Sequence, residues 1–273
     1  MCGIGGKGSF QERPDETIAS AMCDSMSHRG PDSSGVYANG PALLAHTRLS
    51  IIDLTEAGAQ PMANRDGDVH IVFNGEIYNY PELRDKLDHY NYTSETDTEV
   101  ILAAYEEWGT DCLTKLRGMF AFGLWDETEE QLFLARDRLG QKPLFLHTDG
   151  ETLGFASTLS ALLADDSVPV TPDYSALREF LTYQYVPHPK TGFEAIERLE
   201  PGEYLVFDED GTRREQYWSL SFQNQLSTSV SGLQNELESK LREAVSIRMM
   251  SDVPLGVFLS GGVDSTVVTH LMY

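Results

Sequence analysis

The first 220 residues carry short apolar stretches separated by polar turns. These stretches are rich in Val, Ile, Leu and Phe, which is typical of β-strands. Helical spacing, in which apolar residues recur every three or four positions, occurs at 17–26 and again from Asp97 onward. The sequence therefore predicts an α+β fold of antiparallel strands interspersed with a few helices. Strands are expected at 3–6, 42–46, 49–54 and 69–73, hairpins at 119–125 with 132–135, 144–147 with 153–156 and 203–207 with 213–218, and helices at 17–26, 81–87, 97–108, 159–163 and 174–181.

The pattern changes after residue 219. A polar stretch at 227–231 is followed by amphipathic helical spacing at 233–250 and by an apolar run at 253–259 that leads into Ser260-Gly261-Gly262-Val263-Asp264-Ser265. A buried strand that feeds a glycine turn and a new helix is typical of an α/β doubly wound unit. Completing such a sheet takes another ~100–200 residues. We therefore predict one domain at 2–220, a linker at 221–232 and the truncated start of a second domain at 233–273.

The charge balance excludes some partners. With 43 acidic and 20 basic residues, the chain has a net charge of -23, and such a surface repels nucleic acid and anionic membranes. The acidic residues are scattered and lysines are few, which fits a cytoplasmic protein of a halophilic cell, where salt screens the repulsion. The three widely spaced cysteines indicate a reducing compartment rather than a disulfide framework. No signal peptide is expected, because the N-terminus has no basic region followed by an apolar stretch, and no membrane span is expected, because no apolar run reaches ~18 residues.

The second residue is a candidate nucleophile. Removal of Met1 would leave Cys2 at the terminus, with a thiol and a free α-amine on one residue. Because an α-amine titrates near ~7.7–8.0, part of it is unprotonated at neutral pH and can accept the thiol proton. A nucleophile activated by its own amine is an established arrangement. Taken alone, Cys2 could equally be a cysteine on a frayed terminus.

Other candidate residues have structural alternatives of their own. Asn74-Gly75 is a strong signal for a type I′ hairpin turn, but Asn74 also offers an amide donor. Arg48 could bind a carboxylate through two donors, and either Thr96 or Asp97 could cap the helix that begins near Asp97. The loop at 260–265 forms an anion cradle if its backbone N–H groups converge, although it lacks the lysine of a Walker loop. The alternative for this loop is a plain glycine turn.

Taken together, the motifs resemble a known family. Five segments resemble motifs of the class II glutamine amidotransferase domain. They are Cys2-Gly3-Ile4, His28-Arg29-Gly30-Pro31-Asp32, Arg48-Leu49-Ser50-Ile51-Ile52-Asp53, Phe73-Asn74-Gly75-Glu76-Ile77-Tyr78-Asn79 and Gly118-Met119-Phe120-Ala121-Phe122. The loop at 260–265 resembles the pyrophosphate loop of a synthetase domain. The two parts in this order are similar to the glutamine-hydrolysing asparagine synthetase family.

The resemblance implies a fold and a first site. The fold would be a four-layer αββα sandwich of the N-terminal nucleophile hydrolase type, followed by the start of an ATP-pyrophosphatase-like domain. Cys2 would attack the glutamine amide, and Asn74 with Gly75 would bind the oxyanion. Arg48 would bind the α-carboxylate of L-glutamine. Glu76 and Asp97 would bind its α-ammonium group.

The resemblance also implies a second reaction that needs cofactors. ATP and Mg²⁺ would activate L-aspartate, whereas the glutaminase half needs no cofactor, and the sequence offers no metal-ligand cluster. Two alternatives stay open: an amidotransferase that serves another acceptor, and a non-catalytic remnant that binds glutamine or a partner subunit. A homodimer also stays open. The ATP pyrophosphate would be held by Ser260, Gly261, Gly262, Asp264 and Ser265.

Overall fold

Two six-stranded sheets form the centre of the protein. The computed structural model describes residues 1–223 and 229–273, so part of the predicted linker, 224–228, lies outside the described residues. Neighbouring strands pair antiparallel in both sheets. The first sheet has the order β10 (Glu197–Arg198), β8 (Phe145–Thr148), β9 (Thr152–Ala156), β1 (Gly3–Ser9), β3 (Ala42–Arg48), β2 (Ser33–Asn39). The second has the order β12 (Gly211–Gln216), β11 (Glu203–Asp208), β7 (Gln131–Arg136), β6 (Gly118–Asp126), β5 (Val69–Ile77), β4 (Met62–Ala63).

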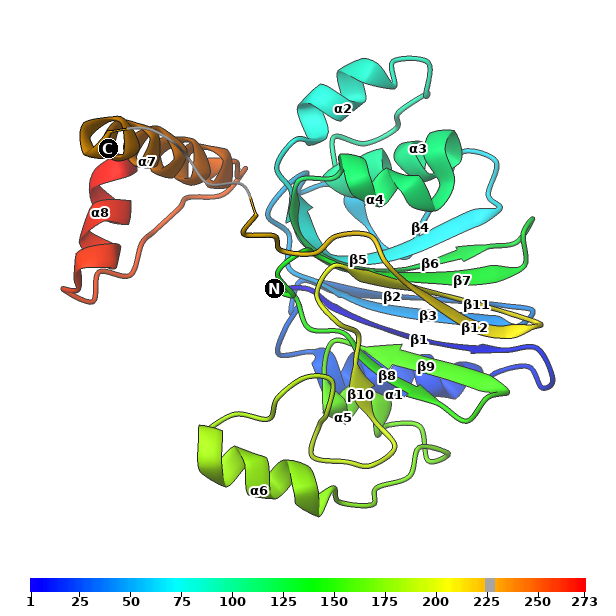
Figure 1. Ribbon diagram of the computed structural model, residues 1–273. Helices are drawn as coiled ribbons and strands as arrows, with labels where there is room; N and C mark the ends of the chain where they lie inside the picture. The colour runs from blue at the N-terminus through cyan, green and yellow to red at the C-terminus, as the bar shows by residue number, and fades with distance from the viewer. Residues whose placement is uncertain (224–228) are drawn as a thin grey trace.

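Helices cover the outer faces of the two sheets (Figure 1). The arrangement is the predicted αββα sandwich, with separate apolar cores under each helical layer and between the sheets. The first sheet is covered by α1 (Glu16–Met26) and α5 (Leu159–Leu162), and the second by α2 (Tyr80–Lys86), α3 (Asp97–Trp108) and α4 (Cys112–Lys115). The remaining helices are α6 (Tyr174–Tyr183), α7 (Val230–Ser246) and α8 (Val263–Leu271), and short 3-10 turns occur at Glu56–Gly58, Gly109–Asp111 and Ile247–Met249.

The strand β5 shows why the apolar runs become buried strands. Ile71 and Phe73 pack in the core beneath α3, whereas Val72 points to the core between the sheets. Because successive side chains of a strand point to opposite faces, a strand with both faces covered must be apolar throughout. Glycines serve a different purpose in β1, where a Cβ on Gly6 would lie 2.4 Å from the carbonyl oxygen of Leu43.

The helix α3 begins at a polar cap and is buried along most of its length. Thr96 is the N-cap, and its hydroxyl accepts a hydrogen bond from the N–H of Glu99 at 3.2 Å. Every residue from Asp97 to Tyr105 is buried. The helix ends at Gly109, whose φ of +56° lies in the left-handed region that favours glycine. Asp97 therefore occupies the first helical position, inside the protein.

One prediction for the sandwich is wrong, and one structural alternative that the sequence left open is excluded. Residues 49–54 are a loop rather than a strand, because Ile51 and Ile52 line a cavity instead of pairing with a neighbouring strand. Asn74 and Gly75 are not a hairpin turn, since they lie inside β5 opposite Ala121 and Phe120 of β6.

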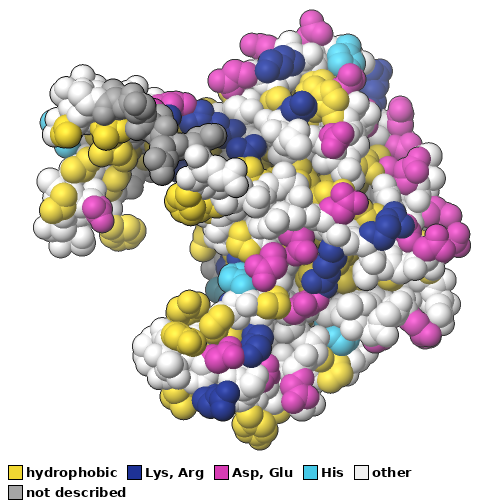
Figure 2. Space-filling view, viewed as in Figure 1, with side chains coloured by type: hydrophobic (Ala, Val, Ile, Leu, Met, Phe, Trp, Pro, Cys, Tyr) yellow, Lys and Arg dark blue, Asp and Glu magenta, His cyan; other side chains and the backbone are white. Residues whose placement is uncertain are grey.

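The C-terminal segment (residues 229–273) departs further from prediction. The apolar run at 253–259 is neither a strand nor buried, and Phe258 is 99% exposed. A strand requires a neighbour for its backbone groups, and the described residues supply none there. The expected helix at 233–250 is α7, which begins earlier and ends at Ser246. Figure 1 shows the segment beside the sandwich, and Figure 2 shows hydrophobic side chains at its surface. No described helix has both the length and the apolar content that crossing a membrane requires.

Candidate active site

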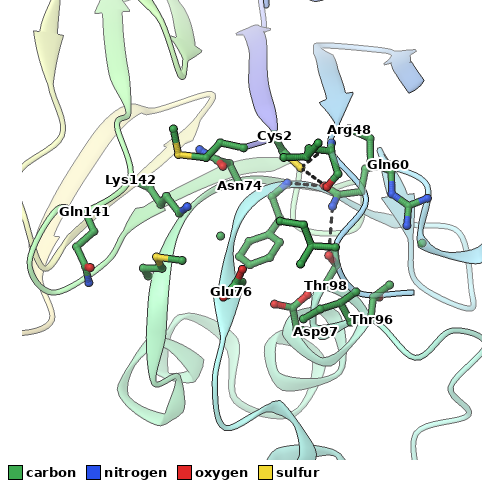
Figure 3. Close-up of a pocket in the computed structure, with 18 residues that line it drawn as sticks. Cys2, Arg48, Gln60, Asn74, Glu76, Thr96, Asp97, Thr98, Gln141 and Lys142 are labelled. Atoms are coloured by element: carbon green, nitrogen blue, oxygen red, sulfur yellow. Dashed lines mark hydrogen bonds between the residues drawn. The ribbon is translucent and has the colours of Figure 1, made fainter. Parts of the chain in front are cut away.

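A cavity of about 370 Å³ opens beside the N-terminus, between the ends of the two sheets (Figure 3). Cys2 enters it from β1, and Asn74, Gly75 and Glu76 enter it from β5. The structure thus brings together all six residues that the sequence analysis assigned to glutamine, including Arg48 and Asp97. The rest of the wall is formed by Met1, Leu49, Ile51, Ile52, Gly58, Gln60, Phe73, Thr96, Thr98, Met119, Gln141 and Lys142.

One edge of β5 faces the cavity with its backbone N–H groups. The partner strand β4 pairs only with His70 and Ile71, so the edge beyond them is free of strand pairing among the described residues. The N–H of Phe73 donates to Gln60 Oε1 at 2.6 Å, and the N–H of Ile77 donates to Asp97 Oδ2 at 2.8 Å.

Gly75 lies midway between these two residues on the same edge. Its cross-strand neighbour Phe120 uses both its N–H and its carbonyl with Asp137, at 3.2 and 2.8 Å. Because the hydrogen-bonding direction alternates along a strand, the Gly75 N–H points toward the cavity. A Cβ at this position would lie 2.4 Å from the carbonyl oxygen of Met119, so the site requires glycine.

The side chain of Asn74 provides a second donor. Asn74 is 1% exposed, and its Nδ2 is buried with no hydrogen-bond partner among the described residues. An unpaired buried amide is costly, and such groups need an explanation. The unpaired Asn74 Nδ2 is explained if it donates to an anionic oxygen of a ligand in the cavity, because the Gly75 N–H faces the same space.

The thiol of Cys2 is held at the end of β1. The N–H of Leu49 donates to Cys2 Sγ at 3.4 Å, and the thiol lies 3.7 Å from the carbonyl oxygen of the same residue. Burial raises the pKa of the Cys2 thiol, so at neutral pH it needs a base before it can attack. Burial also lowers the pKa of the terminal amine of Met1, and the same environment would favour the neutral, basic form of an amine on Cys2.

Arg48 anchors the loop at 49–55. Its Nη1 donates to the carbonyl oxygen of Thr55 at 2.8 Å, and its Nη2 donates to that of Asp53. The side chain is 7% exposed and lies along the cavity wall. Gly58 packs so closely that a Cβ there would meet the guanidinium at 2.3 Å. Arg48 therefore shapes one wall of the cavity in addition to placing a cation there.

Two carboxylates form the acidic end of the cavity, away from Cys2 (Figure 3). The pKa of Asp97 is raised to about 7, mainly by burial and to a smaller extent by the negative charge of Glu76. Burial likewise raises the pKa of Glu76, while Lys142 and Arg248 lower it. Two desolvated carboxylates side by side are suited to an ammonium group, which would stabilise their ionised forms.

Lys142, which was not predicted as a site residue, is 7% exposed and points into the cavity (Figure 3). Burial lowers the pKa of its ammonium group, and the charges of Glu76 and Cys2 raise it. The turn that carries it is fixed by the buried Asp137, whose Oδ2 accepts from the N–H of Lys142 at 2.9 Å. A lysine in the short connection between two strands, in a chain with so few lysines, was the signal that could have revealed it.

Gln60 was also missed. Besides accepting from Phe73, it donates through Nε2 to the hydroxyl of Thr98 at 3.2 Å, so it joins β5 to α3 across the cavity floor. Nothing in the local sequence distinguishes it, because both of its partners are distant along the chain.

The loop at 260–265 lies apart from this cavity. Gly261 has a φ of +81°, and Gly262 caps α8 without a side-chain hydrogen bond, so the first N–H groups of α8 remain available. The hydroxyls of Ser260 and Ser265 lie 3.0 Å apart. Most of the loop is exposed, including Asp264.

Comparison with known proteins assigns a class to this fold and site. The family described as "Glutamine amidotransferase domain" matches residues 1–218. Glutamine phosphoribosylpyrophosphate amidotransferase from B. subtilis superposes with a TM-score of 0.59 at 16% identity, covering 98% of this chain and 63% of that chain. The sandwich thus has the fold of the N-terminal nucleophile amidotransferases.

The chain belongs to the glutamine amidotransferase domain family. Its last part, residues 236–273, matches the family described as "Asparagine synthase". "Asparagine synthetase [glutamine-hydrolyzing] 3" of Bacillus subtilis is 38% identical over 99% of this chain and 45% of its own length. "Putative asparagine synthetase [glutamine-hydrolyzing] 2" of Methanocaldococcus jannaschii is 37% identical over 100% of this chain and 57% of its own length. The chain spans about half the length of these relatives.

Proposed function

We propose that the chain hydrolyses L-glutamine with Cys2 as nucleophile, after removal of Met1. The α-amine of Cys2 takes the thiol proton as Sγ attacks the amide carbon. The tetrahedral oxyanion accepts hydrogen bonds from Asn74 Nδ2 and the Gly75 N–H. The C–N bond then breaks, the amine returns its proton, ammonia leaves, and water hydrolyses the γ-glutamyl thioester to glutamate.

The donor pair at Asn74 and Gly75 is the observation that carries this proposal. An unpaired buried amide and a free-edge N–H face one cavity, which also holds the half-buried thiol of Cys2. The acidic end fits the α-ammonium group of an amino acid, and Arg48, which lines the same cavity, would bind its α-carboxylate. An amidase site for simple amides would not need this second, charged end.

We further propose that the ammonia serves ATP-dependent conversion of L-aspartate to L-asparagine, as the names of the relatives suggest. The loop at 260–265 fits a pyrophosphate through the free N–H groups of α8 and the two serine hydroxyls. Mg²⁺ would enter with the nucleotide near Asp264, since the described residues contain no cluster of three metal-binding side chains. Ser260, Gly261, Gly262 and Ser265 would hold the pyrophosphate.

The domain limits and the cellular setting remain part of the proposal. We propose domains at 2–220 and 233–273; the last strand of the sandwich ends at Gln216, which supports the first limit, while α7 begins at Val230, three residues before the second. A net charge of -23 and three free cysteines support a reducing, high-salt cytoplasm and disfavour nucleic acid or membrane partners. A homodimer remains compatible with the described surface.

The test is glutamate release from glutamine by the parent protein and by Cys2→Ala. We expect Cys2→Ala to abolish release, and the control Cys23→Ala, which alters a cysteine outside the cavity, to keep it. Mass spectrometry of the active protein should show that Met1 has been removed. Equal rates in Cys2→Ala and parent, or an active protein that retains Met1, would refute the mechanism.

A further inference from the structure

The C-terminal segment hydrogen-bonds to the loop that forms one wall of the glutamine cavity. The N–H of Asp252 donates to the carbonyl oxygen of Ile51 at 3.0 Å, and Asp252 Oδ2 accepts from the N–H of Asp53 at 2.8 Å. One residue thus holds the loop through both its backbone and its side chain. Ile51 lines the cavity, and the carbonyl oxygen of Asp53 accepts from Arg48.

The loop needs such support at Asp53. This residue has a φ of +51°, a left-handed conformation that a non-glycine residue adopts at some energetic cost. The Asp53 side chain accepts from the N–H groups of Thr55 and Glu95, both at 3.0 Å, and the N–H of Asp53 donates to Asp252. The conformation that presents the Asp53 carbonyl to Arg48 is therefore held from three sides, one of which is the C-terminal segment.

The same segment reaches the acidic end of the cavity. Arg248 lies over the ring of Tyr78 at 4.8 Å, and its positive charge acts on Glu76. Arg117, which precedes β6, forms an ion pair of 2.6 Å with Glu243 of α7. These contacts place the segment along the cavity on the side of β5 and β6, next to the loop that Asp252 holds.

We infer that Asp252 is a positioning residue for glutamine, supplied by the segment that matches the asparagine synthase family. It acts through the loop at 51–53 and Arg48, and it does not touch the substrate. The inference rests on the proposed glutaminase function. It adds that the glutamine site depends on docking of the second segment, whose chain runs on from Asp252 to the loop at 260–265.

The experiment measures KM and kcat for glutamine hydrolysis in Asp252→Ala, Asp252→Asn and the control Asp88→Ala, which alters an exposed aspartate elsewhere. Asp252→Ala should raise KM roughly two- to fivefold, since it removes one exposed, charge-assisted hydrogen bond, and should leave kcat unchanged. Asp252→Asn keeps an acceptor oxygen and should restore most of the parent KM. Asp88→Ala should match the parent.

Hydrogen exchange provides a readout that does not depend on activity. The Asp53 amide should be protected in the parent and should exchange faster in Asp252→Ala, together with neighbouring amides at 49–55. An unprotected Asp53 amide in the parent, or a parent-like KM in Asp252→Ala, would overturn the inference.

Calorimetric measurement of glutamine binding in the same variants separates this inference from the proposed glutaminase function. A chain that binds glutamine without hydrolysing it refutes the glutaminase, and the Asp252 comparison of affinities still decides the inference.

Discussion

The cavity beside Cys2 and the loop at 260–265 carry equally recognisable motifs but differ in what surrounds them. At the cavity, Asn74 is 1% exposed, and its neighbours along β5 are fixed by hydrogen bonds to Gln60 and Asp97. At the loop, most residues are exposed and the preceding apolar run is unpaired. The donors of the first site are oriented before any ligand arrives, whereas those of the second lie in water.

This difference matters because a hydrogen-bond donor is worth most where water is excluded. In a low-dielectric site a preorganised donor stabilises developing charge strongly, while in water the solvent competes with it. The cavity obtains its walls from the two sheets and α3, which bury the side chains of Arg48, Asn74, Asp97 and Lys142. We therefore expect substitutions at the cavity to change activity greatly, and substitutions at the loop to change it hardly at all in this chain.

Asn74→Ala should have the largest effect among the residues around Cys2. Loss of one oxyanion donor is expected to lower kcat by about 10²–10³, with a smaller change in KM. Steady-state glutamate release measures both. The exposed Asn91→Ala serves as a control and should behave as the parent. A fall in kcat of less than about tenfold would mean that Asn74 does not face the oxyanion.

Asp97→Asn should mainly weaken glutamine binding. Asparagine keeps an acceptor for the N–H of Ile77 but removes the charge that would bind the α-ammonium group. We expect KM to rise by about 10–100-fold, as for loss of a buried charged partner. Glutamine titration by calorimetry checks the change. The exposed Asp88→Asn should leave binding intact, and unchanged binding in Asp97→Asn would place the ammonium group elsewhere.

The raised pKa of Asp97 also predicts that the stability of the ligand-free protein depends on pH. The folded pKa of Asp97, about 7, lies above its ordinary value of 3.8, so between these values the folded state holds a proton that the unfolded state has lost. The contribution of Asp97 to the free energy of unfolding is therefore largest below about pH 4 and is lost as the pH rises through 7. Asp97→Asn should raise the free energy of unfolding at pH 8 by on the order of 2–4 kcal/mol and much less at pH 4. Denaturant unfolding at both pH values checks this, and an equal effect at both would contradict it.

Lys142→Met should have a moderate effect. The lysine charge lowers the pKa of Glu76, so its loss should raise that pKa and move the acidic limb of glutamine binding to higher pH. At pH 7 we expect kcat/KM to fall roughly fivefold, as for one partly buried charge interaction. The exposed Lys86→Met is the matched control. A uniform loss of activity without a shifted pH profile would assign Lys142 a different role.

Prediction from the sequence likewise succeeded for segments buried in the sandwich and failed where residues line the cavity or lie unpaired in the C-terminal segment. Apolar runs with covered faces, such as β5, and capped helices, such as α3 after Thr96, were predictable because local pattern and tertiary burial agree. The run at 49–54 was mistaken for a strand because its apolar residues face a cavity. Gln60 and Lys142 were missed because only the assembled sheets bring them to β5. At 253–259 the apolar pattern is that of a buried strand, but the described residues offer it no partner.

The smallest effects are expected at the loop. Ser260→Ala and Asp264→Asn should leave glutamine hydrolysis unchanged, because neither residue contacts the cavity. ATP with Mg²⁺ should bind this chain only weakly. The exposed N–H groups of α8 compete with water, and a net charge of -23 repels a polyanion. A calorimetric titration should therefore show no saturation below millimolar ATP, at low and at high salt. Sub-millimolar ATP binding that Ser260→Ala abolishes would show that the exposed loop binds the nucleotide without being buried by other residues. The difference between the cavity and the loop would then not depend on burial.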